Sequence, residues 1–322
     1  MQLHKDILVF DNVASVCENI QNEIRSQIFS VLHRRGAVVG ISGGVDSSVT
    51  LALAATALGP DKVLGLMLPE RDSSSESALL AQKLADTFGV KTITEDITGA
   101  LEGFGCYRRR DEAVSVVFPE YDPKTYKMKI GIRQSGLKTG LPPVFYLTIV
   151  KPDGSEESKI LPVNQYAQIV AASNFKQRSR MSMLYYHAER LHYAVVGTPN
   201  KHEVEQGFFV KYGDGGADLM PIGNFYKTQV YQLAKHLGVP EEIIKRTPTT
   251  DTYSAEQTQE EFFYQLPFEQ MDLMWYAFEN NISATEVAPV MDMSADEVEK
   301  IFLSFHRKQQ TTDYLRRGPI HF

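Results

Sequence analysis

The stretch AVVGISGGVDSSVT, residues 37–50, decides the fold of this chain. An apolar run suited to a buried parallel strand leads through a turn of glycine and serine into a helix. Glycines let the backbone approach anionic oxygens closely, and the amides at a helix N-terminus point free N–H groups at an anion. We therefore expect a phosphate-binding loop, although the GKS/T lysine of a Walker loop is missing. Its residues are Gly40, Ile41, Ser42, Gly43, Gly44, Val45, Asp46, Ser47 and Ser48.

Apolar residues on both sides of this loop recur with helical or strand-like spacing. Strands that alternate with helices in this way predict βαβ units, and hence an α/β fold with a Rossmann-like parallel sheet flanked by helices. The expected strands are 37–41, 62–68, 90–97 and 193–197, and the expected helices are 13–32, 49–58, 75–89, 174–191 and 226–238.

The pattern changes over residues 105–163, which contain several prolines and glycines and the alternating stretch VFYLTIV at 144–150. The sequence PDGS at 152–155 is typical of a hairpin turn. We therefore predict a small β-rich insertion at 105–163. Two or three short helices are expected in a helical C-terminal region at about 255–322, and the whole of 1–322 is interpreted as one domain.

The composition is that of an ordinary globular protein, with 43% hydrophobic and 23% charged residues among 322. A net charge of −7 argues against a dedicated nucleic-acid binder, and no apolar run approaches the roughly 18 residues that span a bilayer. We expect neither nucleic acid nor a membrane as a partner. The two cysteines, Cys17 and Cys106, form no CxxC pair and no zinc spacing, which favours a reducing cytoplasm.

Asp46 stands inside the expected phosphate loop, where a carboxylate cannot bind phosphate directly. It therefore indicates a bridging magnesium ion. The alternative is a serine-rich turn that only caps a helix. That alternative does not account for a strand, glycines, an acid and a helix occurring together.

The SGGxDS signature resembles the PP-loop, or N-type ATP pyrophosphatase, superfamily. This resemblance implies an adenine nucleotide alpha hydrolase-like fold and cleavage of ATP between its α- and β-phosphates. Three further blocks narrow the family: SNFKQRSRM at 173–181, TPTTD at 247–251 and the long GTPNKHEVEQGFFVKYGDGGADLMPIGNFYKTQ at 197–229. Together they resemble the ammonia-dependent or glutamine-dependent NAD synthetase family.

The resemblance implies a homodimeric amide ligase that uses ATP and Mg²⁺. Such an enzyme adenylates the carboxylate of deamido-NAD and lets ammonia displace AMP to give NAD. An attached glutaminase domain would need on the order of 200–300 further residues, so we expect ammonia to arrive free or from a separate glutaminase.

Residue roles follow from the same resemblance. Asp46 and Glu203 correspond to metal ligands, Lys227 to a phosphate contact, and Thr198 and Thr249 to nucleotide contacts. The positions that match deamido-NAD contacts are Arg178, Phe208, Lys211, Asp218, His306 and Arg307. Phe208 can either stack on a base or belong to the core. Asp214 can either orient ammonia or hold its loop, and with Asp46 and Lys227 it completes the expected catalytic set.

The chain departs from the family pattern in three places: at 105–163, at Tyr264-Gln265, and at His306-Arg307-Lys308. The departures gather on the acceptor side, where the insertion is expected to cover the acceptor site, enlarge a dimer interface or change specificity. One alternative is therefore the same chemistry on another carboxylate, such as a sugar acid. The other is a silent nucleotide-binding scaffold, against which the intact Asp46, Glu203 and Lys227 argue.

Overall fold

The parallel sheet that carries the phosphate loop contains four strands. In the computed structural model, residues 3–132, 143–249, 252–255, 257–259 and 263–322 are described. The strands are β1 (Ala37–Gly40), β2 (Val63–Met67), β3 (Lys91–Thr94) and β7 (Ala194–Val196), in the order β3-β2-β1-β7. All neighbours are parallel, and Ala37 pairs with Val63 on one side and Ala194 on the other. The predicted α/β fold is confirmed.

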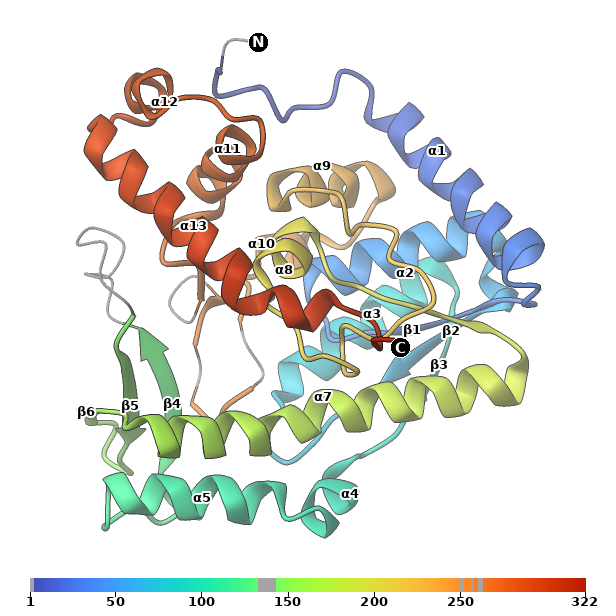
Figure 1. The fold of residues 1–322 in the computed structure, drawn as a ribbon. Coiled ribbons are helices and arrows are strands. Elements are labelled where there is room, and N and C mark those ends of the chain that lie inside the picture. Colours follow the sequence, from blue (N-terminus) through green and yellow to red (C-terminus); the bar gives the residue numbers. More distant parts are fainter. Residues whose placement is uncertain (1–2, 133–142, 250–251, 256, 260–262) are drawn as a thin grey trace.

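Helices cover both faces of this sheet (Figure 1). Because successive strand residues point to opposite faces, Val39 joins the core under one layer of helices and Val38 joins the core under the other. The first layer contains α1 (Val13–Arg25), continued by a π-helical turn at Ser26–Val31, with α2 (Val45–Leu58), α3 (Ser75–Phe88), α9 (Lys227–Leu237) and α10 (Glu241–Lys245). The second contains α4 (Thr98–Gly103), α5 (Cys106–Val117) and α7 (Val163–Leu191).

The sequence had indicated a β-rich insertion at 105–163, but this segment is not β-rich throughout. Its first part forms α5, which packs along α7, and α7 itself begins at Val163 rather than at 174. The helical pattern of α5 was hidden because Arg110, 1% exposed, occupies its buried face alongside Tyr107 and Val114.

The remainder of this segment confirms the predicted strands and turn. An antiparallel sheet in the order β4-β5-β6 consists of β4 (Lys127–Ile132), β5 (Phe145–Val150) and β6 (Glu156–Ile160). Gly154 closes the hairpin with φ +83° and donates its N–H to the Lys151 carbonyl at 2.9 Å. The part of the predicted insertion at 133–142 lies outside the described residues.

The C-terminal helices form a core of their own around Trp275. They are α11 (Phe268–Glu279), α12 (Ala284–Met291) and α13 (Ala295–Arg316), and α13 has 22 residues where only short helices were expected. The short α8 (Lys201–Gln206) lies between this core and the sheet. Over the described ranges, no helix is both long enough and apolar enough to cross a membrane. Residues 256 and 260–262 of the expected helical region are outside those ranges.

Candidate active site

The phosphate loop joins the end of β1 to the start of α2. Gly43 adopts φ +76°, and a Cβ there would lie 2.6 Å from the Ser77 carbonyl oxygen, so this position requires glycine. The hydroxyls of Ser47 and Ser48 donate to the Gly44 carbonyl at 3.0 and 2.8 Å. These serines hold the turn closed, and the first amides of α2 have no partner within the helix, so they can bind an anion.

A cavity of about 600 Å³ opens at the carboxyl ends of β1, β2 and β7, where ligands bind in open parallel sheets. The expected site residues that line it are Gly40, Ile41, Ser42, Gly44, Val45, Asp46, Ser47, Thr198, Glu203, Phe208, Asp214, Lys227 and Thr249. The expected residues that do not line it are Gly43, Ser48, Arg178, Lys211, Asp218, His306 and Arg307. The nucleotide-side residues therefore come together, and most of the expected acceptor contacts lie elsewhere.

A lysine and two carboxylates meet at the mouth of the loop. Lys227, the first residue of α9, has a side chain only 1% exposed, and its Nζ forms an ion pair with Asp46 Oδ2. Asn200 Nδ2 donates to Asp46 Oδ1 at 3.2 Å, while its backbone N–H donates to Glu203 Oε2 at 2.9 Å. Asn200 thus connects the two carboxylates, a role that sequence reasoning missed. The spacing N-x-x-E of a capping box at 200–203 was the available signal.

Burial and mutual charge set the protonation of Glu203 and Lys227 in this cluster. Burial, together with the nearby charge of Asp46, raises the pKa of Glu203 to about 8, although Lys227 opposes the shift. Burial tends to lower the pKa of Lys227, but Asp46 and Glu203 raise it above its ordinary value. Within the described residues, no group of three or more His, Cys, Asp or Glu side chains is placed to hold a metal. Two carboxylates nevertheless fit Mg²⁺, which usually keeps several waters and takes other oxygens from substrate phosphates.

A buried pair braces the two helices that carry this cluster. Asp272 of α11 lies 2.5 Å from His202 Nε2, and its other oxygen accepts the Thr228 N–H at 2.7 Å. His202 precedes Glu203 on α8, and Thr228 follows Lys227 on α9. The C-terminal helices therefore fix the relative position of Glu203 and Lys227.

The loop after α8 contributes to one wall of the cavity. Asp214 accepts the Val210 N–H at 2.7 Å, and burial raises its pKa to about 6. This geometry favours the loop-holding alternative for Asp214.

Phe208 stacks on Phe263 with ring centroids 4.5 Å apart, as a core residue would, and it also lines the cavity, where it could stack on a base. Asp218 accepts from the Val195 N–H at 2.7 Å, outside the cavity.

The expected dinucleotide contacts near the chain's last helix are engaged with protein groups. Lys211 Nζ donates to the Tyr314 and Arg317 carbonyls at 2.8 and 2.7 Å, and Arg178 Nε donates to the Lys211 carbonyl at 3.3 Å. His306 Nε2 lies 2.9 Å from Gln310 Nε2, on the exposed side of α13, and Arg307 is exposed as well.

The neighbouring Lys308, in contrast, points inward. Its Nζ donates to the Phe263 carbonyl at 3.0 Å and lies 4.2 Å from the centroid of that ring. Burial lowers the pKa of Lys308 to about 7. Helical periodicity explains the contrast, because three successive residues of one helix cannot share a face.

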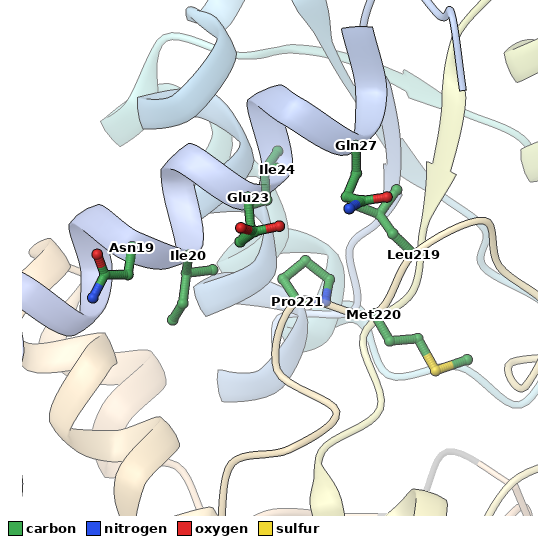
Figure 2. Close-up of a pocket in the computed structure, with 8 residues that line it drawn as sticks. All are labelled: Asn19, Ile20, Glu23, Ile24, Gln27, Leu219, Met220 and Pro221. Atoms are coloured by element: carbon green, nitrogen blue, oxygen red, sulfur yellow. The ribbon is translucent and has the colours of Figure 1, made fainter. Parts of the chain in front are cut away.

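A second, shallower cavity of about 310 Å³ lies between α1 and the turn at 219–221 (Figure 2). Ile20, Ile24, Leu219, Met220 and Pro221 make it mainly apolar. It offers none of the phosphate-binding or metal-binding groups of the first cavity.

A parallel sheet, a glycine–serine loop at its carboxyl edge and a lysine between two carboxylates define a nucleotide-binding protein of the PP-loop ATP pyrophosphatase class. The family model described as NAD synthase matches residues 13–117 and 153–317. The chain belongs to the NAD synthase family.

Individual relatives agree with this assignment. The chain is 46% identical over 318 residues to the NH(3)-dependent NAD(+) synthetase of Rhizobium rhizogenes, covering 99% of this chain and 95% of that protein. Two solved structures share the fold. The NMN synthetase from Francisella tularensis has a TM-score of 0.65 at 21% identity, covering 97% of this chain and 99% of that chain. The NH3-dependent NAD synthetase from Campylobacter jejuni has a TM-score of 0.63 at 20% identity, covering 97% and 100%.

The match to the family model is interrupted within the segment 105–163. The family model leaves out residues 118–152, a shorter stretch than the predicted 105–163, and α5 lies within the matched part. The Rhizobium relative aligns with 99% of the chain and so extends across this stretch.

Proposed function

We propose that this protein is an ammonia-dependent NAD synthetase, a ligase that forms a C–N bond. It adenylates the carboxylate of deamido-NAD with ATP and amidates it with ammonia, and the products are NAD, AMP and pyrophosphate. The observation that carries the proposal is the cluster of Asp46, Glu203 and Lys227 at the mouth of the phosphate loop. The 46% identical relative, which is named for this activity and matches nearly the whole chain, supports it.

The chain's own groups supply positioning and electrostatics. Amides at the start of α2 bind phosphate oxygens, and Lys227 places a positive charge where the leaving pyrophosphate gains negative charge. The deamido-NAD carboxylate oxygen attacks the α-phosphorus of ATP and pyrophosphate departs. Ammonia then attacks the acyl carbon of the mixed anhydride and AMP departs, so no side-chain nucleophile is needed.

Asp46 and Glu203 are the residues that we assign to Mg²⁺. When bound, Mg²⁺ neutralises charge on the phosphate oxygens. Glu203 must lose its proton to act as a ligand, and its raised pKa means that the proton is held near neutral pH until a cation replaces it.

The remaining assignments divide by whether the residue lines the cavity. We assign Thr198 and Thr249 to ATP and Phe208 to the dinucleotide, because these three line the cavity. Arg178, Lys211, Asp218, His306 and Arg307 are assigned to the dinucleotide on the family resemblance alone. They would meet it outside the cavity, near the subunit interface of a homodimer. Asp214 is assigned to holding its loop.

The broader setting is part of the same proposal. Residues 1–322 act as one domain with small-molecule substrates, in the cytoplasm, and ammonia comes free or from a separate glutaminase. Neither nucleic acid nor a membrane is a partner.

One assay tests the activity. Purified protein receives ATP, Mg²⁺, ammonium and deamido-NAD, and both AMP and NAD are measured, with Asp46→Asn as the inactive control. Equal amounts of AMP and NAD are expected. AMP release that requires another carboxylate, such as nicotinic acid mononucleotide or a sugar acid, would refute deamido-NAD as the acceptor.

A further inference from the structure

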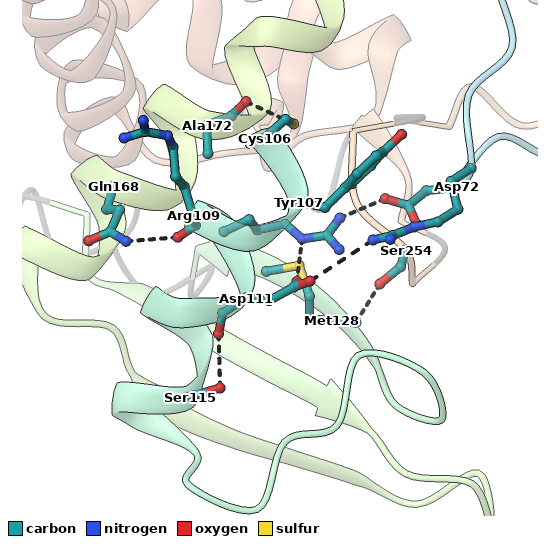
Figure 3. A network of polar contacts seen from close by, with 12 residues as sticks. Asp72, Cys106, Tyr107, Arg109, Asp111, Ser115, Met128, Gln168, Ala172 and Ser254 are labelled. Carbon is teal, nitrogen blue, oxygen red and sulfur yellow. Dashed lines mark hydrogen bonds and ion pairs between the residues drawn. The ribbon is translucent and has the colours of Figure 1, made fainter. Parts of the chain in front are cut away.

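The short segment 252–255 connects the nucleotide cavity to the sheet β4-β5-β6. Thr252 and Tyr253 line the cavity together with Thr249. On its other side the segment meets β4: the Ala255 N–H donates to the Met128 carbonyl at 3.1 Å, and the Met128 N–H donates to Ser254 Oγ at 2.9 Å. Figure 3 shows the second of these contacts. Since β4 is an edge strand of its sheet, the segment covers hydrogen-bonding groups that would otherwise be open.

A buried aromatic ring fixes the segment more firmly than these two hydrogen bonds. Tyr253 is 4% exposed and belongs to the core formed between the small sheet, α5 and α7. Its neighbours in that core include Met128, Ile130, Leu147 and Ile149, which are fully buried. Withdrawing Tyr253 would expose a large apolar surface, so the small sheet holds the segment at a defined place on the cavity wall.

The buried Lys176 ties the same segment to the loop after β2. Lys176 of α7 is 1% exposed, and its Nζ donates to Glu70 Oε1 at 2.8 Å, Asp72 Oδ2 at 2.9 Å and the Thr252 carbonyl at 3.0 Å. An ammonium group has three N–H donors, so all three are used within the protein. Lys176 therefore positions other groups and has no donor left for a substrate phosphate.

The loop after β2 that carries Glu70 and Asp72 also lines the cavity, through Pro69, Ser73 and Ser74. Helix α5 completes the connection, because Arg110 pairs with Asp72 at 2.6 Å and the Tyr107 hydroxyl donates to Glu70 at 2.7 Å. A continuous set of buried contacts thus joins the small sheet, α5, α7 and the loop after β2 around the cavity wall.

We propose that the small sheet β4-β5-β6, most of which lies in the stretch that the family model leaves unmatched, is a positioning element for the ATP pocket. Its edge strand and its core hold segment 252–255, and Lys176 locks that segment to the loop after β2. This proposal rests on the proposed function of the cavity as the ATP site. It gives the insertion a role on the nucleotide side, whereas the sequence had indicated the acceptor side.

The test separates ATP binding from the rest of the reaction. Ser254 does not line the cavity, so Ser254→Ala removes the bond to Met128 without touching a ligand. The Kd for ATP with Mg²⁺, measured by calorimetry without acceptor, is expected to rise about two- to tenfold, which corresponds to one hydrogen bond. Ser254→Thr keeps the hydroxyl and should restore the affinity. The KM values for deamido-NAD and ammonium should stay unchanged.

Two further variants should show a larger effect on the Kd for ATP and no effect on it. Tyr253→Ala should raise the Kd for ATP by more than about tenfold, because only the fraction of molecules with the segment in place binds well. Thr148→Val removes a 2.7 Å bond to Ser158 within the same sheet, away from the segment, and should leave the Kd unchanged. Circular dichroism spectra and melting temperatures confirm that each variant is folded.

Unchanged ATP affinity in folded Ser254→Ala and Tyr253→Ala would overturn the proposal, as would an equal shift in Thr148→Val. A rise confined to the KM of deamido-NAD would also overturn it and return the insertion to the acceptor side. A wild-type protein that fails to bind ATP would instead contradict the proposed function, so the two failures are distinguishable.

Discussion

Two buried lysines, each close to two carboxylates, line the same cavity. Lys227 meets Asp46 and Glu203 beside the phosphate loop, and Lys176 meets Glu70 and Asp72 below segment 252–255. Both side chains are at most 2% exposed. The residue types are the same in the two clusters and the two lysines are equally buried, so neither property identifies the site of chemistry.

The clusters differ in whether their charges are already neutralised. Lys176 uses all three donors, and although burial opposes it, the charges of Lys176 and Arg110 lower the pKa of Asp72 to about 2. Lys227, over the described part of the chain, has one carboxylate within ion-pair distance, and Glu203 holds a proton up to a pKa of about 8. A saturated cluster stabilises the fold, whereas an unsaturated one leaves a place for a cation and a phosphate.

The largest expected effect tests the saturated cluster. Lys176→Met leaves Glu70 and Asp72 buried without their ammonium partner, and we expect the free energy of unfolding to fall by about 3–5 kcal/mol. Urea denaturation measures this change. Lys245→Met is the control, because Lys245 is 76% exposed in its pair with Glu241 and should cost less than about 1 kcal/mol. Similar losses in the two variants would remove the distinction between the clusters.

The matching change in the unsaturated cluster should affect the reaction more than the fold. Lys227→Met removes the charge facing the leaving group, and we expect kcat/KM for AMP release to fall about 10²–10³-fold. The loss of unfolding free energy should be smaller than in Lys176→Met, because Asp46 borders the open cavity and can be hydrated. Activity within tenfold of wild type would contradict the role assigned to Lys227.

The contrast also explains what sequence can predict. The loop at 40–48 is contiguous, so its glycines, serines and acid could be recognised together, and the parallel sheet followed from the periodicity around it. The Lys176 cluster draws on four separate segments, and nothing in the sequence shows that Asp72 and Arg110 meet. A buried charged residue also obscures the apolar periodicity by which a helix is recognised, as Arg110 does on the buried face of α5.

The expected dinucleotide contacts on α13 show a second property that sequence does not predict, the phase of a helix. Family resemblance aligned His306 and Arg307 with a dinucleotide-binding motif, but the phase of a helix decides which residue of three turns inward, and here it is Lys308. Helix phase depends on the packing of α13 against α8 and α11, which local sequence does not specify.

The two clusters should respond to pH in opposite directions. The pKa of Glu203 is raised above its ordinary 4.5, so its contribution to stability is full below that value and is lost as pH rises toward about 8. Without Mg²⁺, wild type should therefore lose stability relative to Glu203→Gln between pH 4.5 and 8. Urea denaturation across that range measures the difference, and saturating Mg²⁺ should abolish it.

The pKa of Asp72 is lowered from 3.8 to about 2, so its contribution is full above 3.8 and is lost as pH falls toward 2. Wild type should accordingly lose its advantage over Asp72→Asn on acidification below pH 3.8. Parallel pH profiles for the Glu203 and Asp72 variants would show that the clusters are electrostatically alike.

The smallest effect concerns Asp214, whose charge adds to that of Asp46 in raising the pKa of Glu203. Asp214→Asn keeps an oxygen that can accept the Val210 N–H, so we expect less than about a fivefold loss of kcat/KM. Asp214→Ala removes the acceptor and should lose more, together with thermal stability. A large loss in Asp214→Asn at unchanged stability would instead support direct contact with ammonia.

The pairing of β1 with β7 has a consequence for how the protein is made. Ala37 finds its second parallel neighbour only at Ala194, far later in the chain. At synthesis rates of roughly 5–20 residues per second, the nascent chain waits on the order of ten seconds for that strand. Until then Val38 and Val39, which are fully buried in the finished protein, belong to a strand whose edge toward β7 is unpaired. The cavity at the carboxyl ends of β1, β2 and β7 is therefore completed late in translation.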